Sequence, residues 1–180
     1  MTKIELVGSK FGGRVMTALA DLLTNPNSSL EELELRRCSL DDEGAIILGT
    51  ALAGNSTLRN LNLFRTRGVT SRGWMAIFNQ LLQSEQQSSL EKLDLSENVF
   101  DCDTAMMLGF ALNGTHVKSL RLGKCKFTSE GWKYLCAGLA GPRCMLQHLN
   151  LYGCHDFDDG MMKYLANSLS SLRSKAGRPP

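Results

Sequence analysis

The stretch LEELELRRCSL, residues 30–40, has leucines at positions 30, 33, 35 and 40 and a cysteine at position 38. A strand on a protein surface would alternate apolar and polar residues throughout, whereas a helix would repeat apolar residues every three or four positions. The stretch follows neither pattern over its whole length. Leu33 and Leu35 alone are spaced like the inward side chains of a short strand. The stretch therefore indicates one strand and turn of a longer repeating unit.

The same leucine spacing recurs along the chain. Copies begin near residues 1, 30, 58, 90, 117 and 146, so the steps between them are 29, 28, 32, 27 and 29 residues. A period of this length is typical of leucine-rich repeats. The sequence thus predicts an α/β fold, a leucine-rich repeat solenoid of about six repeats with a curved parallel sheet on its concave face and helices on its convex face. We expect a single domain over residues 1–172 and a basic, proline-ending tail over residues 173–180.

One position after each strand is expected to face inward, where the chain turns. A buried Asn, Cys, Ser or Thr there can hydrogen-bond backbone groups that the turn leaves unpaired. Such side chains would form a polar ladder along the stack. The predicted ladder residues are Ser9, Cys38, Thr66, Asn98, Cys125 and Cys154.

A second, longer period lies over the first. The segment AIILGTALAGNSTL at 45–58 matches AMMLGFALNGTHV at 105–117, and GWMAIFNQLL at 73–82 matches GWKYLCAGLA at 131–140. With two kinds of helical segment in alternation, the chain resembles the ribonuclease-inhibitor-like class of leucine-rich repeat proteins, which implies a strand and a full helix in each repeat. Three features depart from that pattern: a weak first copy, extra residues around 83–88, and a sixth helix at 161–169 that resembles the fifth.

Several residues of the helical segments have expected structural roles. Asp41 and Asp42 are possible caps of the helix that follows them. Trp74 and Trp132 recur at the same place near a helix start, which favours a structural role under the convex surface. The methionine pairs at 106–107 and 161–162 are expected to pack within the helical layer.

Composition narrows the location of the protein and its partners. The chain is 43% hydrophobic with a formal net charge of +2, and it has neither a long apolar run nor a signal peptide at its start. We therefore expect a cytoplasmic, or else nuclear, protein without a membrane span. Nucleic acid is not expected as a partner, because the basic residues are interleaved with acidic ones.

In a cytoplasmic or nuclear protein the six cysteines are expected to be free thiols, with only Cys102 and Cys144 in loops. The sequons at Asn27, Asn55 and Asn113 are interpreted as turn residues.

Both ends of the predicted solenoid look open. An uncapped terminal repeat would expose core leucines, so we expect that the chain is part of a longer protein or that a partner covers an end. The last residues, SLRSKAGRPP, include Arg173, Lys175 and Arg178. They are interpreted as a solvated end, with a binding role as the alternative.

The outward residues of the six strands are the candidate binding surface. We expect their side chains to pack against nothing within the domain. The fourth strand with Glu91 has one lysine and three acids, whereas the fifth has three bases, and such opposite strips would suit a partner of complementary charge. Phe64 and Tyr152 fit either simple β-propensity or a role as interface anchors. The predicted partner-binding residues are Glu34, Arg36, Arg37, Asn62, Phe64, Arg65, Asp94, Ser96, Glu97, Arg121, Lys124, Asn150 and Tyr152.

The sequence contains no recognisable catalytic or cofactor motif. His116, His148 and His155 have no triad-like partners, and no zinc-protease or phosphate-loop motif occurs. A zinc site from Cys125, Cys154 and His148 is conceivable, but the ladder role already accounts for both cysteines and no Cys-x-x-Cys pair is present. We expect no enzyme activity, no metal and no cofactor.

These observations predict a non-catalytic scaffold that binds a protein partner through its concave face. A rigid, preformed surface lowers the ordering cost of binding. The family resemblance also implies an alternative, a regulator of a small GTPase similar to the Ran GTPase-activating protein. A structural subunit of a larger assembly is a further alternative, because it would explain the open ends.

Overall fold

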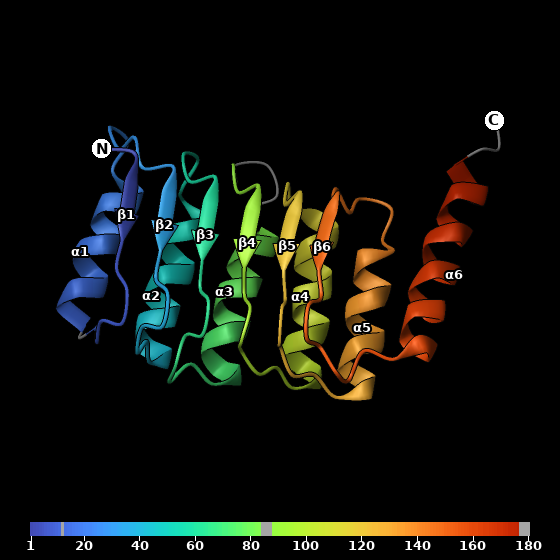
Figure 1. Ribbon diagram of the computed structural model, residues 1–180. Coiled ribbons are helices and arrows are strands. Elements are labelled where there is room, and N and C mark those ends of the chain that lie inside the picture. The colour runs from blue at the N-terminus through green and yellow to red at the C-terminus, as the bar shows by residue number, and fades with distance from the viewer. Residues whose placement is uncertain (12, 84–87, 177–180) are drawn as a thin grey trace.

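In the computed structural model, strands and helices alternate along the chain. The structure describes residues 1–11, 13–83 and 88–176. Figure 1 shows the strands in one layer and the helices in a second layer behind it. The strands are β1 (Lys3–Glu5), β2 (Glu32–Glu34), β3 (Asn60–Asn62), β4 (Lys92–Asp94), β5 (Ser119–Arg121) and β6 (His148–Asn150). The helices are α1 (Gly13–Thr24), α2 (Asp42–Ala53), α3 (Ser71–Gln83), α4 (Cys102–Gly114), α5 (Ser129–Leu139) and α6 (Asp159–Ala176).

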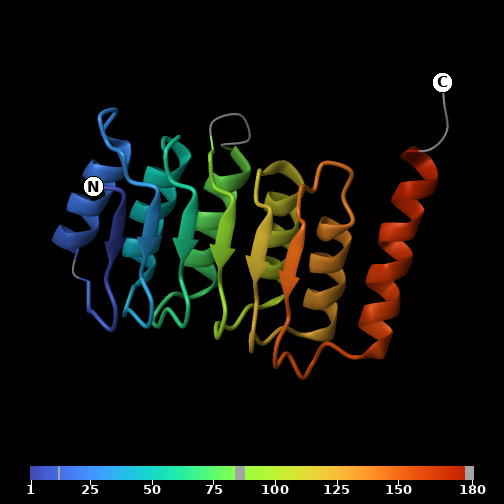
Figure 2. The same ribbon diagram turned by 45° about the horizontal axis from the view of Figure 1, so that its top comes forward.

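The strands form one parallel sheet in sequence order, from β1 to β6. Their middle residues are in register, so that Leu33 pairs with Leu61 and Leu61 with Leu93. The predicted leucine-rich repeat solenoid is thus confirmed. Figures 1 and 2 show an uncurled sheet, so the face that we expected to be concave is a broad, open surface. We call it the sheet face: the side that carries the first and third residues of each strand.

The strand leucines point away from the sheet face and meet the helices in the core. Leu33, Leu61, Leu93 and Leu120 are each at most 2% exposed, and burial of such a side chain contributes about 1.5–3 kcal/mol. The second strand lies one residue earlier than the predicted segment 33–35. Because side chains alternate along an extended chain, Leu35 still points into the core just after β2 ends.

A chain of aromatic rings runs through the core between the two layers. Trp74 and Trp132 are 2% and 1% exposed, which agrees with their expected structural role. Phe100 and Phe127 lie between them, with centroid distances of 5.2 Å from Trp74 to Phe100, 5.1 Å from Phe100 to Phe127 and 4.3 Å from Phe127 to Trp132. Aromatic contacts of this kind add to the stability from burial alone.

Glycines explain the longer sequence period. A Cβ atom on Gly49 of α2 would lie 3.1 Å from the carbonyl oxygen of Ala76 in α3. At the matching position of α4, a Cβ on Gly109 would lie 2.9 Å from the carbonyl oxygen of Tyr134 in α5. A Cβ atom on Gly109 would force the two backbones apart, and a Cβ on Gly49 would make an unusually tight contact, so glycine favours this close approach. The alternation of helix types therefore corresponds to two closely packed pairs, α2 with α3 and α4 with α5.

Polar side chains begin several helices. Asp41, rather than Asp42, caps α2, because its side chain accepts a hydrogen bond from Gly44 N–H at 2.8 Å. Thr128 caps α5 in the same way, with Gly131 as the donor at 3.1 Å. Each such cap satisfies a backbone donor that the helix itself cannot pair.

Two expectations about the helical layer were wrong, the second of them in part. Cys102 is the first residue of α4, not a loop residue. Met162 is 53% exposed, so it does not pack, whereas Met161 contacts the core. The last helix ends at Ala176, and the domain over residues 1–172 with a tail over residues 173–180 stays a prediction. The extra residues of the third repeat lie mostly at 84–87, outside the described residues, as does Arg178.

Candidate functional site

The ladder residues lie beneath the turns that follow the strands. Cys38, Cys125 and Cys154 each donate a thiol hydrogen to a backbone oxygen of the preceding repeat, at distances of 3.0, 3.0 and 2.9 Å from Sγ. Asn98 is 4% exposed and donates to two carbonyl oxygens, both at 2.8 Å. Ser9 is only half-buried. These side chains fix the turns above them and hold the rim of the sheet face in position.

Burial keeps the ladder thiols protonated. It raises the pKa of Cys125 to about 12 and also raises the pKa of Cys154. A thiolate is the form that attacks electrophiles and binds metals. These cysteines therefore serve as hydrogen-bond donors. Among the described residues, no three His, Cys, Asp or Glu side chains are grouped as a metal site would require.

Charged residues occupy a left-handed backbone position directly before the ladder residue in four repeats. Arg37, Arg65, Glu97 and Lys124 have φ angles of 56°, 51°, 59° and 55°. A residue with a Cβ pays about 1–2 kcal/mol for this conformation. The four side chains line the strand-end edge of the sheet face. Glu97 joins two of them, 3.4 Å from Arg65 and 3.6 Å from Lys124.

The strips of opposite charge on β4 and β5 pair with each other. Lys118 Nζ lies 2.9 Å from Glu91, and Arg121 Nη1 lies 3.8 Å from Asp94. The prediction that these side chains pack against nothing in the domain was wrong. They are within reach because parallel strands in register bring equivalent residues side by side. The charge pattern therefore holds the sheet together as well as facing outward.

A second set of ion pairs covers the first two strands. Lys3 Nζ lies 2.7 Å from Glu34, and Arg36 contacts both Glu34 and Glu5. The hydrogen bond with Glu34 raises the pKa of Lys3, and the hydrogen bond with Arg36 lowers the pKa of Glu5. The predicted binding residues Glu34 and Arg36 are thus partly neutralised by their own neighbours.

Some predicted binding residues also shape their own strand ends. The side chains of Asn62, Asp94 and Asn150 each accept a hydrogen bond from the backbone N–H two positions later, at 2.9, 3.0 and 2.9 Å. Ser96 is 9% exposed and accepts from Gly123 N–H at 3.1 Å. The structure therefore gives these four residues a local role, whatever contacts they make with a partner.

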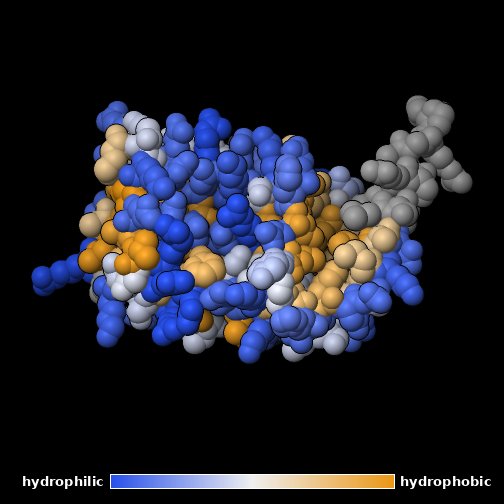
Figure 3. All heavy atoms as spheres, viewed as in Figure 1, coloured by the Kyte–Doolittle hydropathy of each residue, from blue (hydrophilic) through white to orange (hydrophobic). Residues whose placement is uncertain are grey.

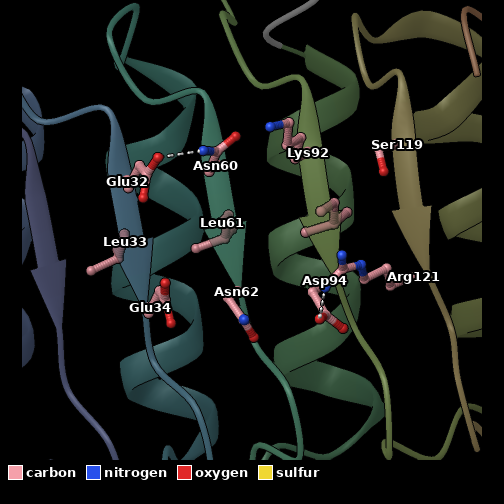
Figure 4. A pocket seen from close by; sticks show the side chains of 11 residues that line it. Glu32, Leu33, Glu34, Asn60, Leu61, Asn62, Lys92, Asp94, Ser119 and Arg121 are labelled. Carbon is pink, nitrogen blue, oxygen red and sulfur yellow. Dashed lines mark hydrogen bonds and ion pairs between the residues drawn. The ribbon is translucent and has the colours of Figure 1, made fainter. Parts of the chain in front are cut away.

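A shallow pocket of about 160 Å³ lies in the middle of the sheet face, between β2 and β5 (Figure 4). Drug-sized ligands usually occupy cavities of about 300–1,000 Å³. Polar side chains form its rim, with Asn60 donating to Glu32 at 2.9 Å and Arg121 reaching towards Asp94. In size and polarity the pocket suits one side chain of a protein better than a free small molecule.

The two candidate anchor aromatics differ in exposure. Phe64 is half-buried, with the Arg37 guanidinium 5.7 Å from its ring centre. Tyr152 is 74% exposed, with Lys124 Nζ 6.0 Å from its ring centre. Each ring thus makes a cation–π contact with a side chain of the neighbouring turn. Such a contact stabilises the pair by about 0.5–1 kcal/mol at exposed sites. Tyr152 offers the larger free apolar area.

The strand ends also form a hollow that the sequence analysis missed. Arg37, Arg65 and Arg67 line it, and we call it the arginine hollow. A second hollow beside it shares Arg65 and Arg67 and is bordered by Val69 and Val99. Arg67 and Val99 each lie one position after a ladder residue. They are therefore not among the outward strand positions from which the candidate binding residues were predicted. The arginine pattern in RTR at 65–67 is the signal that could have found this site.

Apolar surface gathers at both ends of the sheet face. Figure 3 shows mostly hydrophilic atoms over β2 to β5, with hydrophobic areas over β1 and between β6 and α6. Leu149 and Leu151 are partly exposed at one end and Ile4 and Leu6 at the other, unlike the fully buried leucines of the central strands. Within the described residues, none of the helices combines the length and apolar character needed to cross a membrane.

Comparisons with known proteins agree with the repeat architecture. A family model described as "Leucine Rich repeat" matches residues 27–49 and 115–136. The chain is 33% identical over 138 residues to the Mus musculus "NACHT, LRR and PYD domains-containing protein 14", covering 76% of this chain and 14% of that protein. It is 29% identical over 174 residues to the Homo sapiens protein 13 of the same name series, covering 96% of this chain and 16% of that protein. The chain therefore spans a small part of the length of these relatives.

A solved structure has the same fold. The "Leiomodin-1 Actin-Binding Site 2 (ABS2)" chain superposes with a TM-score of 0.54 over 98% of this chain and 83% of that chain. The sequence identity is 18%, so this likeness concerns the fold alone.

Proposed function

Because the chain is a leucine-rich repeat protein, we propose that it is a non-catalytic interaction module that binds a protein partner on the sheet face. The observation that carries this proposal is the pair of side chains at the β5–β6 end of that face. Tyr152 is 74% exposed, and the Arg121 side chain is 64% exposed. Arg121 is the last residue of β5 and Tyr152 lies two residues after β6, and the buried hydrogen bonds of Cys125 and Cys154 hold the turns that follow these strands. Exposed Tyr and Arg on a rigid support are the residue types that most often anchor protein interfaces.

The repeat class belongs to the same proposal. Each described helix has at least 11 residues, and the two helix types alternate through glycine contacts. Both features support the ribonuclease-inhibitor-like class. Relatives whose names include LRR domains also support an interaction role, since they place such repeats within much longer proteins.

Affinity capture from cell extract, followed by binding assays with the purified partner, tests the proposal. The test variant is Phe64→Ala/Arg121→Glu/Tyr152→Ala. A matched control, Phe110→Ala/Arg72→Glu/Tyr134→Ala, removes the same residue types from the helical layer, where Phe110 and Tyr134 are 52% and 46% exposed. We expect the partner to be lost by the first variant and kept by the second. Equal binding by the wild type and the sheet-face variant would contradict the proposal.

A structural role in a larger assembly is the second candidate, and the apolar surface between β6 and α6 favours it. Chemical cross-linking of the captured complex separates the two. Cross-links from Lys92 and Lys124 would support binding on the sheet face, whereas cross-links confined to Lys163 of α6 would support a partner that covers the apolar end.

A further inference from the structure

The arginine hollow concentrates positive charge at the ends of β2 and β3. Its three arginines, Arg37, Arg65 and Arg67, come from two successive turns. Arg65 shares Glu97 with Lys124. Arg37 lies over the ring of Phe64, and in the described part of the chain neither Arg37 nor Arg67 makes an ion pair. The acids of the adjoining loop make their hydrogen bonds elsewhere, since Asp41 caps α2 and Asp42 accepts from Thr70. The guanidinium groups of Arg37 and Arg67 are therefore left without a paired carboxylate, whereas Arg65 is paired with Glu97.

The backbone beneath the three guanidinium groups is held by hydrogen bonds. The N–H groups of Arg37, Arg65 and Arg67 donate to carbonyl oxygens of neighbouring repeats at 2.8, 2.8 and 2.9 Å. The left-handed conformations of Arg37 and Arg65 further restrict these turns. Arginine presents a planar fork of donors that matches a carboxylate, and less freedom is lost when its base is already fixed.

The depression beside the hollow has both polar and apolar lining. Val99 is 67% exposed there, next to Val69, whereas Glu97, Thr66 and Asn98 supply polar groups. A small inorganic anion would leave the exposed Val99 side chain uncovered. An occupant that fills both parts has carboxylates followed closely by an apolar side chain.

We propose that the arginine hollow binds an acidic segment of a protein partner, with Asp or Glu carboxylates on Arg37 and Arg67 and an adjacent apolar side chain against Val99. The proposal deepens the interaction role proposed above, because it assigns the strand-end edge to a partner of stated charge. Binding should weaken with added salt, since it depends on charges that solvent reaches.

Fluorescence polarisation of the full chain with a labelled peptide containing Glu-Glu-Leu-Glu tests this. We expect binding that the Arg37→Gln/Arg67→Gln variant weakens by at least about tenfold, because two charge-assisted contacts are lost. A matched control, Arg14→Gln/Lys163→Gln, removes two positive charges from the exposed helical layer and should bind like the wild type. The peptide with Gln in place of Glu should not bind.

Each of the following outcomes overturns the proposal: no binding of the acidic peptide, equal binding of the Gln peptide, unchanged binding by the double variant, or an equal loss in the control. Tighter binding of a phosphoserine peptide than of the Glu peptide would also overturn it, by assigning the hollow to phosphate. The Arg121→Glu/Tyr152→Ala variant should keep the peptide. If no partner were captured in the sheet-face test but the acidic peptide still bound, the sheet-face proposal would therefore be refuted and the arginine-hollow proposal would stand.

Discussion

Asn98 connects two repeats through Thr66. Its side-chain oxygen accepts the backbone N–H of Thr66 in the preceding repeat at 3.0 Å, while its amide nitrogen donates to Leu63 and Leu95. Asn98→Ala would leave the buried N–H group of Thr66 without an acceptor. The carbonyl oxygens of Leu63 and Leu95 would each lose one donor. We expect a loss of about 2–4 kcal/mol in the free energy of unfolding, measured by urea denaturation. A loss below about 1 kcal/mol would contradict a supporting role for the ladder.

Gly138→Ala should disrupt the contact between α4 and α5. A Cβ there would lie 2.3 Å from the Cα atom of Gly109, and backbone atoms cannot move aside cheaply. We expect a loss of more than about 2 kcal/mol in thermal or urea unfolding. Gly54→Ala is the matched control, because a Cβ on Gly54 meets nothing within 4 Å. Similar effects of the two substitutions would show that the helices can separate without cost.

The buried thiols predict a loss of stability at alkaline pH. The pKa is raised to about 12 for Cys125 and to about 11 for Cys136, so both stay protonated in the folded state while the unfolded thiols ionise near pH 9. The stability that these protonated thiols contribute is fully present below about pH 9. It is lost as the pH rises towards their pKa values in the folded state, by up to about 1.4 kcal/mol per pH unit for each thiol. Urea unfolding under reducing conditions measures this slope.

The Cys125→Ala/Cys136→Ala variant provides the comparison. It should be less stable near neutral pH, because it removes packing, but its stability should fall less steeply above about pH 9. Parallel slopes for the variant and the wild type would mean that other groups cause the alkaline loss.

Arg121 and Asp94 should differ in their effect on stability although they pair with each other. Arg121 is mostly exposed and makes a long contact of 3.8 Å, so Arg121→Ala should change the free energy of unfolding by less than about 1 kcal/mol. The Asp94 side chain is 16% exposed and accepts the N–H of Ser96, so Asp94→Ala should cost about 1–2 kcal/mol. Denaturation of both variants measures the difference. If Arg121→Ala unfolded the protein, Arg121 could not be used to probe binding.

The sequence alone was sufficient to predict the repeat spacing, the parallel sheet and the buried tryptophans. The reason is that Leu33, Leu61 and their counterparts must be inward at fixed intervals for any stack of this kind to have a core. The ladder positions followed from the same spacing.

The contacts between repeats were not predictable in the same way. Glu97 reaches Arg65 and Lys124 only because neighbouring turns share one backbone conformation, and alternation within a single strand does not show this. The arginine hollow was missed for the same reason, since Arg67 lies past the strand. Residues that met across repeats were therefore interpreted as free surface when the structure pairs them.

The close packing of α2 on α3 and of α4 on α5 has a consequence for how such a chain can change in length. Insertion of one repeat after α3 would break the alternation that α2 to α5 follow, and which α6, a helix similar in sequence to α5, does not continue, so that a glycine would face a partner not shaped for it. Insertion of two successive repeats preserves the match. A duplicated or deleted segment that is tolerated between α2 and α5 should accordingly contain an even number of repeats, which makes the pair the natural unit for building longer or shorter versions of this part of the molecule.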